Sequence, residues 1–299
     1  MKIIILIPLI YTEEVAIIKK NTFFIALFLI LLIIVSRYFQ RDYLNPCLEI
    51  HFLDVGQGDS VLIRSSKGFV VLIDGGGPQS ENRFHLNRYL KSRSISRINA
   101  LILSHPHSDH LGGFLSLFDE FLIDSIFMTE AEHSSQLYTD WLKTIEYHNP
   151  DIYFPYRGDK IMIGDLIFEV IHPDDINLYS SLNNSSISLI LNYEGLSTLF
   201  TGDIEKVVES SIINSRLLNE IDILKVAHHG SDTSTKPEFL KYISPKIAVI
   251  SVGENNFNHP SLETINNLIK NDVNILRTDK DGDIIFYWFS KQNKLYRVQ

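Results

Sequence analysis

Residues 101–113 read LILSHPHSDHLGG, and this stretch puts metal-ligand chemistry directly behind an apolar run. The run from Ala100 to Leu103 predicts a buried strand, and the loop after it carries three histidines and one aspartate from His105 to His110. Neutral imidazoles and carboxylates are the ligand types that Zn²⁺ and similar divalent ions prefer. Chance clustering on a solvated loop is the alternative, but so dense a pattern behind a buried strand predicts a metal site.

The spacing within the loop suggests two ions rather than one. His105 and His107 are separated by a single residue, so an extended backbone can aim both imidazoles at one cation. Asp109 and His110 come after the chain turns, where they can face a second cation.

The order His-x-His-x-Asp-His resembles the signature of the metallo-β-lactamase fold, a hydrolase superfamily that binds up to two metal ions. The resemblance implies that His105 and His107 hold one metal and that Asp109 and His110 hold the other. It also implies an α/β fold built as a four-layer α/β/β/α sandwich. Alternating apolar runs, turns and helical patterns from Leu48 onward fit that architecture.

Two earlier segments narrow the resemblance. Residues 52–60 read FLDVGQGDS and residues 73–76 read IDGG, which is similar to the hydrolase domain of ComEC-type competence proteins. Those proteins act in DNA uptake across bacterial membranes. In the superfamily the aspartate matching Asp74 orients the metal loop, whereas the plainer interpretation makes it a turn former. The glycines after it let the backbone approach a ligand or another segment.

Later segments supply the other ligands that the resemblance implies. Asp203, in Thr-Gly-Asp after an apolar strand, would bridge both metals, because the two oxygens of one carboxylate can hold two cations close together. In the His-His-Gly-Ser segment we expect His229 to be a ligand and His228 a phosphate contact or general acid, although the reverse assignment stays open. His259, before Pro260, would contact substrate or simply open a helix.

One departure concerns the first metal. Many superfamily members have a histidine shortly before the strand that leads to the bridging aspartate, but residues 183–186 here read Asn-Asn-Ser-Ser. ComEC-type domains have a similar segment. The first metal would then have His105, His107 and Asp203 as its protein ligands, and His172 is a weak candidate for the open position.

Local patterns also predict two elements near these motifs. The apolar stretch from Phe114 to Leu122 predicts a helix after the metal loop, and Ser261 to Lys270 predicts another after His259. Residues 277–282 resemble the closing hairpin of the family, with Gly282 supplying the turn.

Composition sets broad limits on function. The chain has 299 residues with 45% hydrophobic and 21% charged side chains, which is ordinary for a folded globular protein. Its net charge of −9 argues against broad nonspecific binding to a nucleic-acid backbone, without excluding a local basic groove. Cys47 is the one cysteine, so an intramolecular disulfide and a cysteine-rich zinc site are both excluded.

The first forty residues differ from the rest. Paired lysines precede an uninterrupted apolar run from Phe23 to Ser36, and arginines follow it. A membrane span needs about 17–25 residues, so we predict an anchor helix at about residues 21–39 within an N-terminal segment 1–41. The hydrolase domain would be residues 42–299, on the extracytoplasmic side. A cleaved signal peptide lacks its small-residue cleavage pattern, and a core helix would be amphipathic.

The resemblance runs from about Leu48 to the carboxyl end, and the large multi-helix channel of ComEC proteins has no counterpart. We therefore expect a single-anchor relative of the hydrolase domain rather than a complete DNA importer.

The expected activity is hydrolysis of a phosphoester by water activated at two divalent ions, Zn²⁺ or Mn²⁺. Asp74 or Asp109 would receive a proton, and His228 and His259 would stabilise or protonate the leaving group. The nearest resemblance indicates a phosphodiesterase or nuclease, with single-stranded DNA as one substrate. The alternatives are an esterase on a cell-envelope phosphoester such as phosphorylcholine, and a non-catalytic metal-binding envelope protein. The motifs match a different branch from the β-lactam hydrolases.

Overall fold

The computed structural model describes residues 20, 22–36, 46–78, 86–175 and 178–298. The chain divides into two compact units, with the boundary between Pro46 and Cys47. In the first unit, residues 22–36 are helical and their apolar side chains are exposed. The rest of the predicted anchor, residues 21 and 37–39, lies outside the described residues. No helix within the described ranges has both the length and the apolar character that a membrane span requires.

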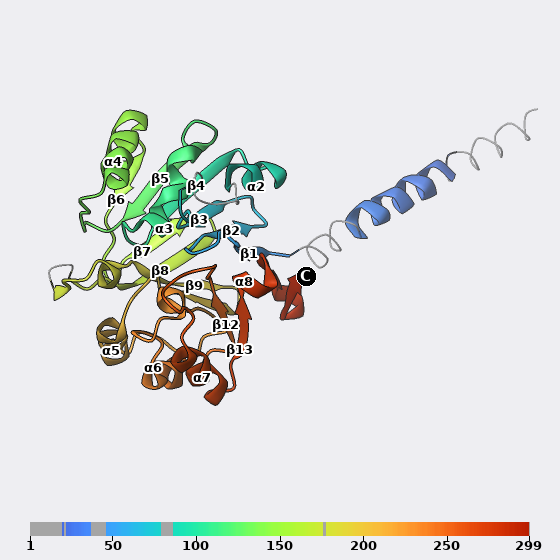
Figure 1. The fold of residues 1–299 in the computed structure, drawn as a ribbon. Helices are drawn as coiled ribbons and strands as arrows, with labels where there is room; N and C mark the ends of the chain where they lie inside the picture. Colours follow the sequence, from blue (N-terminus) through green and yellow to red (C-terminus); the bar gives the residue numbers. More distant parts are fainter. Residues whose placement is uncertain (1–19, 21, 37–45, 79–85, 176–177, 299) are drawn as a thin grey trace, which may run out of the picture. The chain divides into compact units, whose positions relative to one another are not determined.

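The second unit contains two sheets (Figure 1). The first sheet has the order β15-β14-β1-β2-β3-β4-β5-β6 within the described part of the chain. Its strands are β1 (Leu48–Phe52), β2 (Val61–Ser65), β3 (Val70–Ile73), β4 (Arg97–Leu103), β5 (Leu122–Met128), β6 (Asp151–Tyr153), β14 (Ile284–Phe289) and β15 (Lys294–Val298).

The second sheet has the order β13-β12-β11-β10-β9-β8-β7. Its strands are β7 (Lys160–Ile163), β8 (Leu166–His172), β9 (Ser188–Tyr193), β10 (Leu196–Phe200), β11 (Ile223–Lys225), β12 (Ile247–Ile250) and β13 (Asn274–Arg277).

Helices cover the outer face of each sheet (Figure 1). The first sheet carries α2 (Leu86–Ser92), α3 (Ser108–Leu111), the 3₁₀ turn η1 (Gly112–Leu117) and α4 (Gln136–His148). The second carries α5 (Lys206–Ser215), α6 (Pro237–Ile243) and α7 (Leu262–Lys270). Serine side chains cap two of these helices, since Ser135 accepts from the backbone N–H of Tyr138 and Ser261 from that of Thr264.

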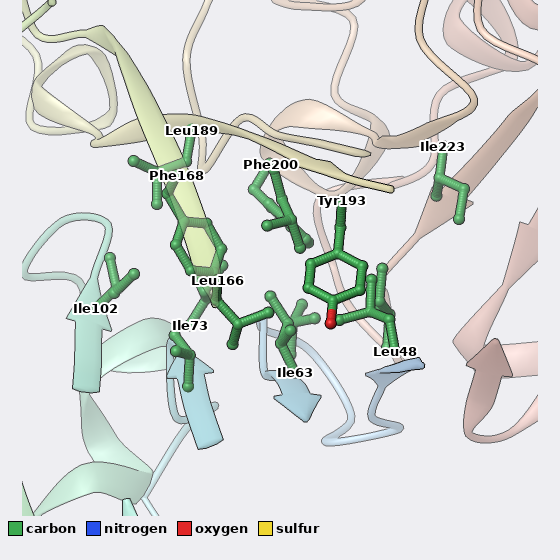
Figure 2. Packing of buried hydrophobic residues seen from close by; sticks show 14 of the residues in the cluster. Leu48, Ile63, Ile73, Ile102, Leu166, Phe168, Leu189, Tyr193, Phe200 and Ile223 are labelled. Atoms are coloured by element: carbon green, nitrogen blue, oxygen red, sulfur yellow. The ribbon is translucent and has the colours of Figure 1, made fainter. Parts of the chain in front are cut away.

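Alternation along the strands sends apolar side chains to both faces of each sheet. The core between the sheets contains side chains of both, such as Ile63 from β2, Phe168 from β8 and Phe200 from β10 (Figure 2). Separate outer cores form around Trp141 of α4 and around Phe239 of α6. The predicted four layers, α/β/β/α, are therefore present.

The direction of the strands places the loops that carry the candidate site at the carboxyl ends of the strands in each sheet. β3 and β4 are parallel neighbours, so Asp74 and the metal loop both follow the carboxyl ends of strands on the same side of the first sheet. β10, β11 and β12 are also parallel, so the segments after them leave the second sheet together. Binding sites in α/β sheets lie at such carboxyl ends.

Two local predictions need correction. The helix predicted from Phe114 to Leu122 is confirmed only in part, because the 3₁₀ helix η1 ends at Leu117 and β5 already begins at Leu122. The predicted closing hairpin at Gly282 is a crossover between the sheets, with α8 (Thr278–Asp281) inside it. β13 pairs with β12 in the second sheet, whereas β14 pairs with β1 in the first.

Candidate metal centre

The loop after β4 supplies four of the predicted ligands. His105 and His110 are fully buried. His105 Nε2 lies 2.9 Å from His107 Nδ1, and His110 Nε2 lies 3.9 Å from Asp109 Oδ2. The chain turns into α3 directly after His107. The turn does not separate the two predicted pairs of side chains, because the ring centroid of His105 lies 4.2 Å from that of His110.

Asp203, after β10, joins this loop from the opposite sheet. Its Oδ2 atom lies 3.3 Å from His110 Nε2, 3.4 Å from His229 Nε2 and 4.0 Å from His105 Nε2. Its Oδ1 atom instead lies 3.7 Å from the ammonium of Lys225. We expected the two oxygens to serve one cation each, but a single oxygen faces the histidines of both predicted metal sites.

The two consecutive histidines after β11 have different surroundings. Both have left-handed backbone conformations, with φ of 51° at His228 and 52° at His229. His229 Nδ1 donates to the carbonyl oxygen of Ser251 at 2.9 Å, which leaves Nε2 at 3.2 Å from Asp109 Oδ2. His228 Nε2 lies 3.3 Å from Asn183 Nδ2, outside the cluster. His229 is thus the histidine that the fold brings to the predicted ligands.

The donor atoms fit divalent cations. His110 Nε2 and His229 Nε2 are buried and have no hydrogen-bond partner among the described residues, and Asp203 Oδ2 is the carboxylate oxygen that lies near both. Ligand atoms within 4.8 Å of one another form four overlapping groups: His105/His110/Asp203, Asp109/His110/His229, Asp59/Asp74/His110 and Asp59/Asp203/His229. His107 belongs to none of these groups and joins the cluster through its contact with His105. Imidazole nitrogens with carboxylate oxygens are a donor set suited to Zn²⁺ or Mn²⁺.

Asp74 lies behind the cluster, in the position that an orienting role requires. It accepts hydrogen bonds from the backbone N–H and the hydroxyl of Ser104, each at 2.7 Å. Its Oδ2 atom lies 2.8 Å from His110 Nδ1. Such a contact fixes the ring and directs Nε2 toward the centre. The glycines after Asp74 serve close backbone approach to the metal loop, since Gly75 N–H donates to the carbonyl of His110 at 2.6 Å.

The sequence interpretation missed two buried residues, Asp59 and Lys225. Asp59 comes from the Gly-Gln-Gly-Asp-Ser turn and forms an ion pair with Lys225, the last residue of β11. The Asp59 carboxylate also lies 3.4 Å from His229 Nδ1 and 3.7 Å from His110 Nδ1. The sequence did contain one signal for Lys225, which is a lysine at the end of an apolar strand, just before the His-His segment.

Burial and nearby carboxylates together set the pKa values of the histidines in the cluster. Burial lowers the pKa of His105 well below its usual value, so this ring is neutral and ready to ligate. Burial also opposes charge on His110 and His229, yet Asp203 and the other nearby carboxylates raise the pKa of both well above the usual value. Cations bound here would replace those protons.

Further side chains surround the cluster. The ring centroid of His259 lies 5.3 Å from that of His228, and the ring of Phe257 lies 5.7 Å from that of His259. Phe257 is 70% exposed. On another side, the ring of His133 lies 5.8 Å from that of His107. Neither Phe257 nor His133 was predicted to contribute. Phe257 lies within the segment that carries His259, whereas His133 lies outside the motifs.

The segment without the usual histidine closes one wall of the centre. The Ser186 hydroxyl lies 3.3 Å from His105 Nδ1 and accepts from the backbone N–H of Asp203 at 3.0 Å. His172 Nε2 donates to the carbonyl oxygen of Asn184 at 2.8 Å. His172 therefore supports this segment and does not fill the open position of the first metal.

Residues 53–254 match the metallo-beta-lactamase superfamily, and the chain belongs to that family. Membership implies binding of divalent metal, in agreement with the clustered donors. ComE operon protein 3 of Bacillus subtilis (strain 168) is 33% identical over 263 residues, which cover 81% of this chain and 34% of that protein. Recombination protein 2 of Haemophilus influenzae is 26% identical and covers 98% of this chain and 34% of its own length.

These relatives confirm the resemblance to ComEC-type competence proteins, and the chain spans about a third of their length. Among solved structures, Igni18, a metallo hydrolase from Ignicoccus hospitalis, superposes with a TM-score of 0.55 at 14% identity. The match covers 80% of this chain and 99% of that one, and it concerns the fold alone.

Proposed function

We propose that the protein is a metal-dependent phosphodiesterase that cleaves single-stranded DNA. The observation that carries the proposal is the convergence of buried ligand atoms from both sheets. Asp203 Oδ2, from the second sheet, lies 3.3 Å from His110 Nε2 of the first sheet and 3.4 Å from His229 Nε2 of the second. We assign His105, His107 and Asp203 to one divalent ion. Asp203 is shared with the other ion, which Asp109, His110 and His229 complete.

Divalent ions at these positions would activate a water molecule and take up negative charge on the phosphoryl oxygens. The chain's own side chains do the rest. Asp74 holds His110 through Nδ1. Asp109 has a partly exposed side chain and is better placed than the enclosed Asp74 to receive a proton. His228 and His259 form a pair beside the cluster that can contact or protonate a leaving group.

The aromatic surroundings favour nucleic acid over other phosphodiesters. Phe257 exposes 70% of its surface. Its ring lies beside that of His259, and the ring of His259 lies beside that of His228. An exposed aromatic ring next to a phosphodiester site can stack on a base of a single strand. The name of one relative, Recombination protein 2, points the same way. The net charge of −9 is the observation that favours an uncharged or zwitterionic envelope substrate such as a phosphorylcholine ester instead.

We further propose that the apolar helix at residues 22–36, with its flanking residues, anchors the hydrolase domain to a membrane on the extracytoplasmic side. Exposure of every side chain in this helix is compatible with lipid contact. An external protease should therefore digest the domain in intact cells. Protection of the domain would reverse the orientation.

The activity is tested with full-length protein loaded with Zn²⁺ or Mn²⁺. It should hydrolyse bis-p-nitrophenyl phosphate and single-stranded DNA, and Asp203→Ala should abolish both reactions. Asp140→Ala, on the surface of α4, is the matched control and should retain them. Turnover of a phosphorylcholine ester without DNA cleavage would support the envelope substrate. Binding of two ions without turnover of any ester would support the alternative of a non-catalytic metal-binding protein.

A further inference from the structure

Lys225 is a buried cation beside the predicted ligands. It ends β11, exposes 2% of its surface and forms an ion pair with Asp59. Its ammonium also donates to the carbonyl oxygen of Gly202 at 3.2 Å and lies 3.7 Å from Asp203 Oδ1. A buried ammonium is costly unless it is paired and hydrogen-bonded, so this placement is specified by the fold.

Asp59 connects the same cation to the second metal site. Its carboxylate lies behind His229 and His110, at 3.4 and 3.7 Å from their Nδ1 atoms. Its backbone is fixed as well, because Asp59 N–H donates to the carbonyl of Asp109 at 3.1 Å. Gly58 fits against that same carbonyl, since a Cβ there would lie 2.3 Å from it. The turn thus contacts Asp109, His110 and His229 from one side.

We propose that the buried Asp59–Lys225 pair positions the metal ligands, with the Lys225 ammonium acting as a built-in cation. By attracting Oδ1 of Asp203, Lys225 turns Oδ2 toward the histidines of both metal sites. The proposal rests on the proposed function only in that the cluster binds divalent metal, and it holds whatever substrate is cleaved.

The charge balance gives a physical reason for such a cation. Asp59, Asp74, Asp109 and Asp203 crowd around two histidines, and carboxylates this close repel one another before metal arrives. Lys225 offsets one of these charges permanently and keeps Asp203 from rotating away. Without the pair, the ligands would reorganise on binding, and metal affinity would fall.

Metal binding by the full-length protein tests this directly, without any substrate. Co²⁺ is titrated into metal-free protein and followed by calorimetry and by its visible absorption, and ion content is measured by mass spectrometry. Two double variants remove both charges together, Asp59→Asn with Lys225→Met and Asp59→Asn with Lys225→Gln. The second keeps a hydrogen bond between the partners. The matched control is Glu169→Gln with Lys160→Met, which removes an exposed ion pair.

A folded double variant should bind Co²⁺ about 10- to 100-fold more weakly than wild type, the usual cost of losing a residue that orients metal ligands. Its absorption spectrum should change because the Asp203 oxygens are no longer fixed, and the control pair should leave both readouts unchanged. Wild-type affinity and spectrum in a folded double variant would overturn the proposal. Failure of both double variants to fold would also overturn it, by assigning the pair to folding alone. Normal Co²⁺ binding by a wild-type protein that cleaves no ester would reject only the proposed function.

Discussion

Glu209 of α5 is a buried acid that should make the stability of the protein depend on pH. It exposes 1% of its surface and accepts hydrogen bonds from the backbone N–H groups of Thr235 and Lys236, at the start of α6. Burial raises the pKa of Glu209 from 4.5 to about 7. The folded protein therefore holds this proton more tightly than the unfolded chain does.

The sign follows from that order of pKa values. The contribution of Glu209 to stability is fully present below about pH 4.5 and is lost as pH rises through 7. At about 1.4 kcal/mol per pKa unit, the full effect is about 3 kcal/mol. Between pH 5 and pH 8 the free energy of unfolding should fall by about 2.5 kcal/mol through this group.

Urea unfolding of metal-free protein at pH 5 and pH 8 measures this effect. Glu209→Gln carries no titrating proton, so the fall between the two pH values should be smaller in the variant by about 2.5 kcal/mol. Other groups, including the site histidines, titrate in both proteins and cancel in the difference. Glu220→Gln, at an exposed position, should behave as wild type. An equal pH dependence in wild type and Glu209→Gln would refute the reasoning.

Three further outcomes follow from the site. Asp74→Ala should weaken metal binding about 10- to 100-fold, because His110 loses its orienting partner; unchanged affinity in calorimetry would reject that role. Phe257→Ala should raise KM for single-stranded DNA about 5- to 100-fold but leave an oligonucleotide abasic at the stacked position unaffected, whereas Tyr147→Ala on α4 should change neither; equal effects on both strands would exclude stacking. Gly58→Ala should lower Tm and metal content together, since its Cβ would meet the Asp109 carbonyl at 2.3 Å; an unaltered Tm would contradict this packing.

The convergence of the motifs could be predicted because each one follows an apolar strand. Parallel strands β3 and β4 end at one edge, so Asp74 and the metal loop had to lie together. The same holds for Asp203 and the His-His segment after β10 and β11. Local sequence predicts where each strand ends and each loop begins, whereas the meeting of the motifs from both sheets at one site was implied by the family resemblance.

Other features depend on contacts between distant parts of the chain. No local pattern links Asp59 to Lys225, whose pairing requires both sheets to be packed. The different directions of His228 and His229 come from two left-handed residues in succession, which their sequence does not signal. The prediction of a closing hairpin was wrong because a glycine turn does not indicate which sheet each flanking strand will join.

The proposed ligand set is divided between the two halves of the sandwich, with His105, His107, Asp109 and His110 on one and Asp203 and His229 on the other. Neither half supplies all the proposed ligands of both ions, so ions bound by both halves would also hold the two halves together. Chelation should then lower the stability of the whole domain rather than that of one loop.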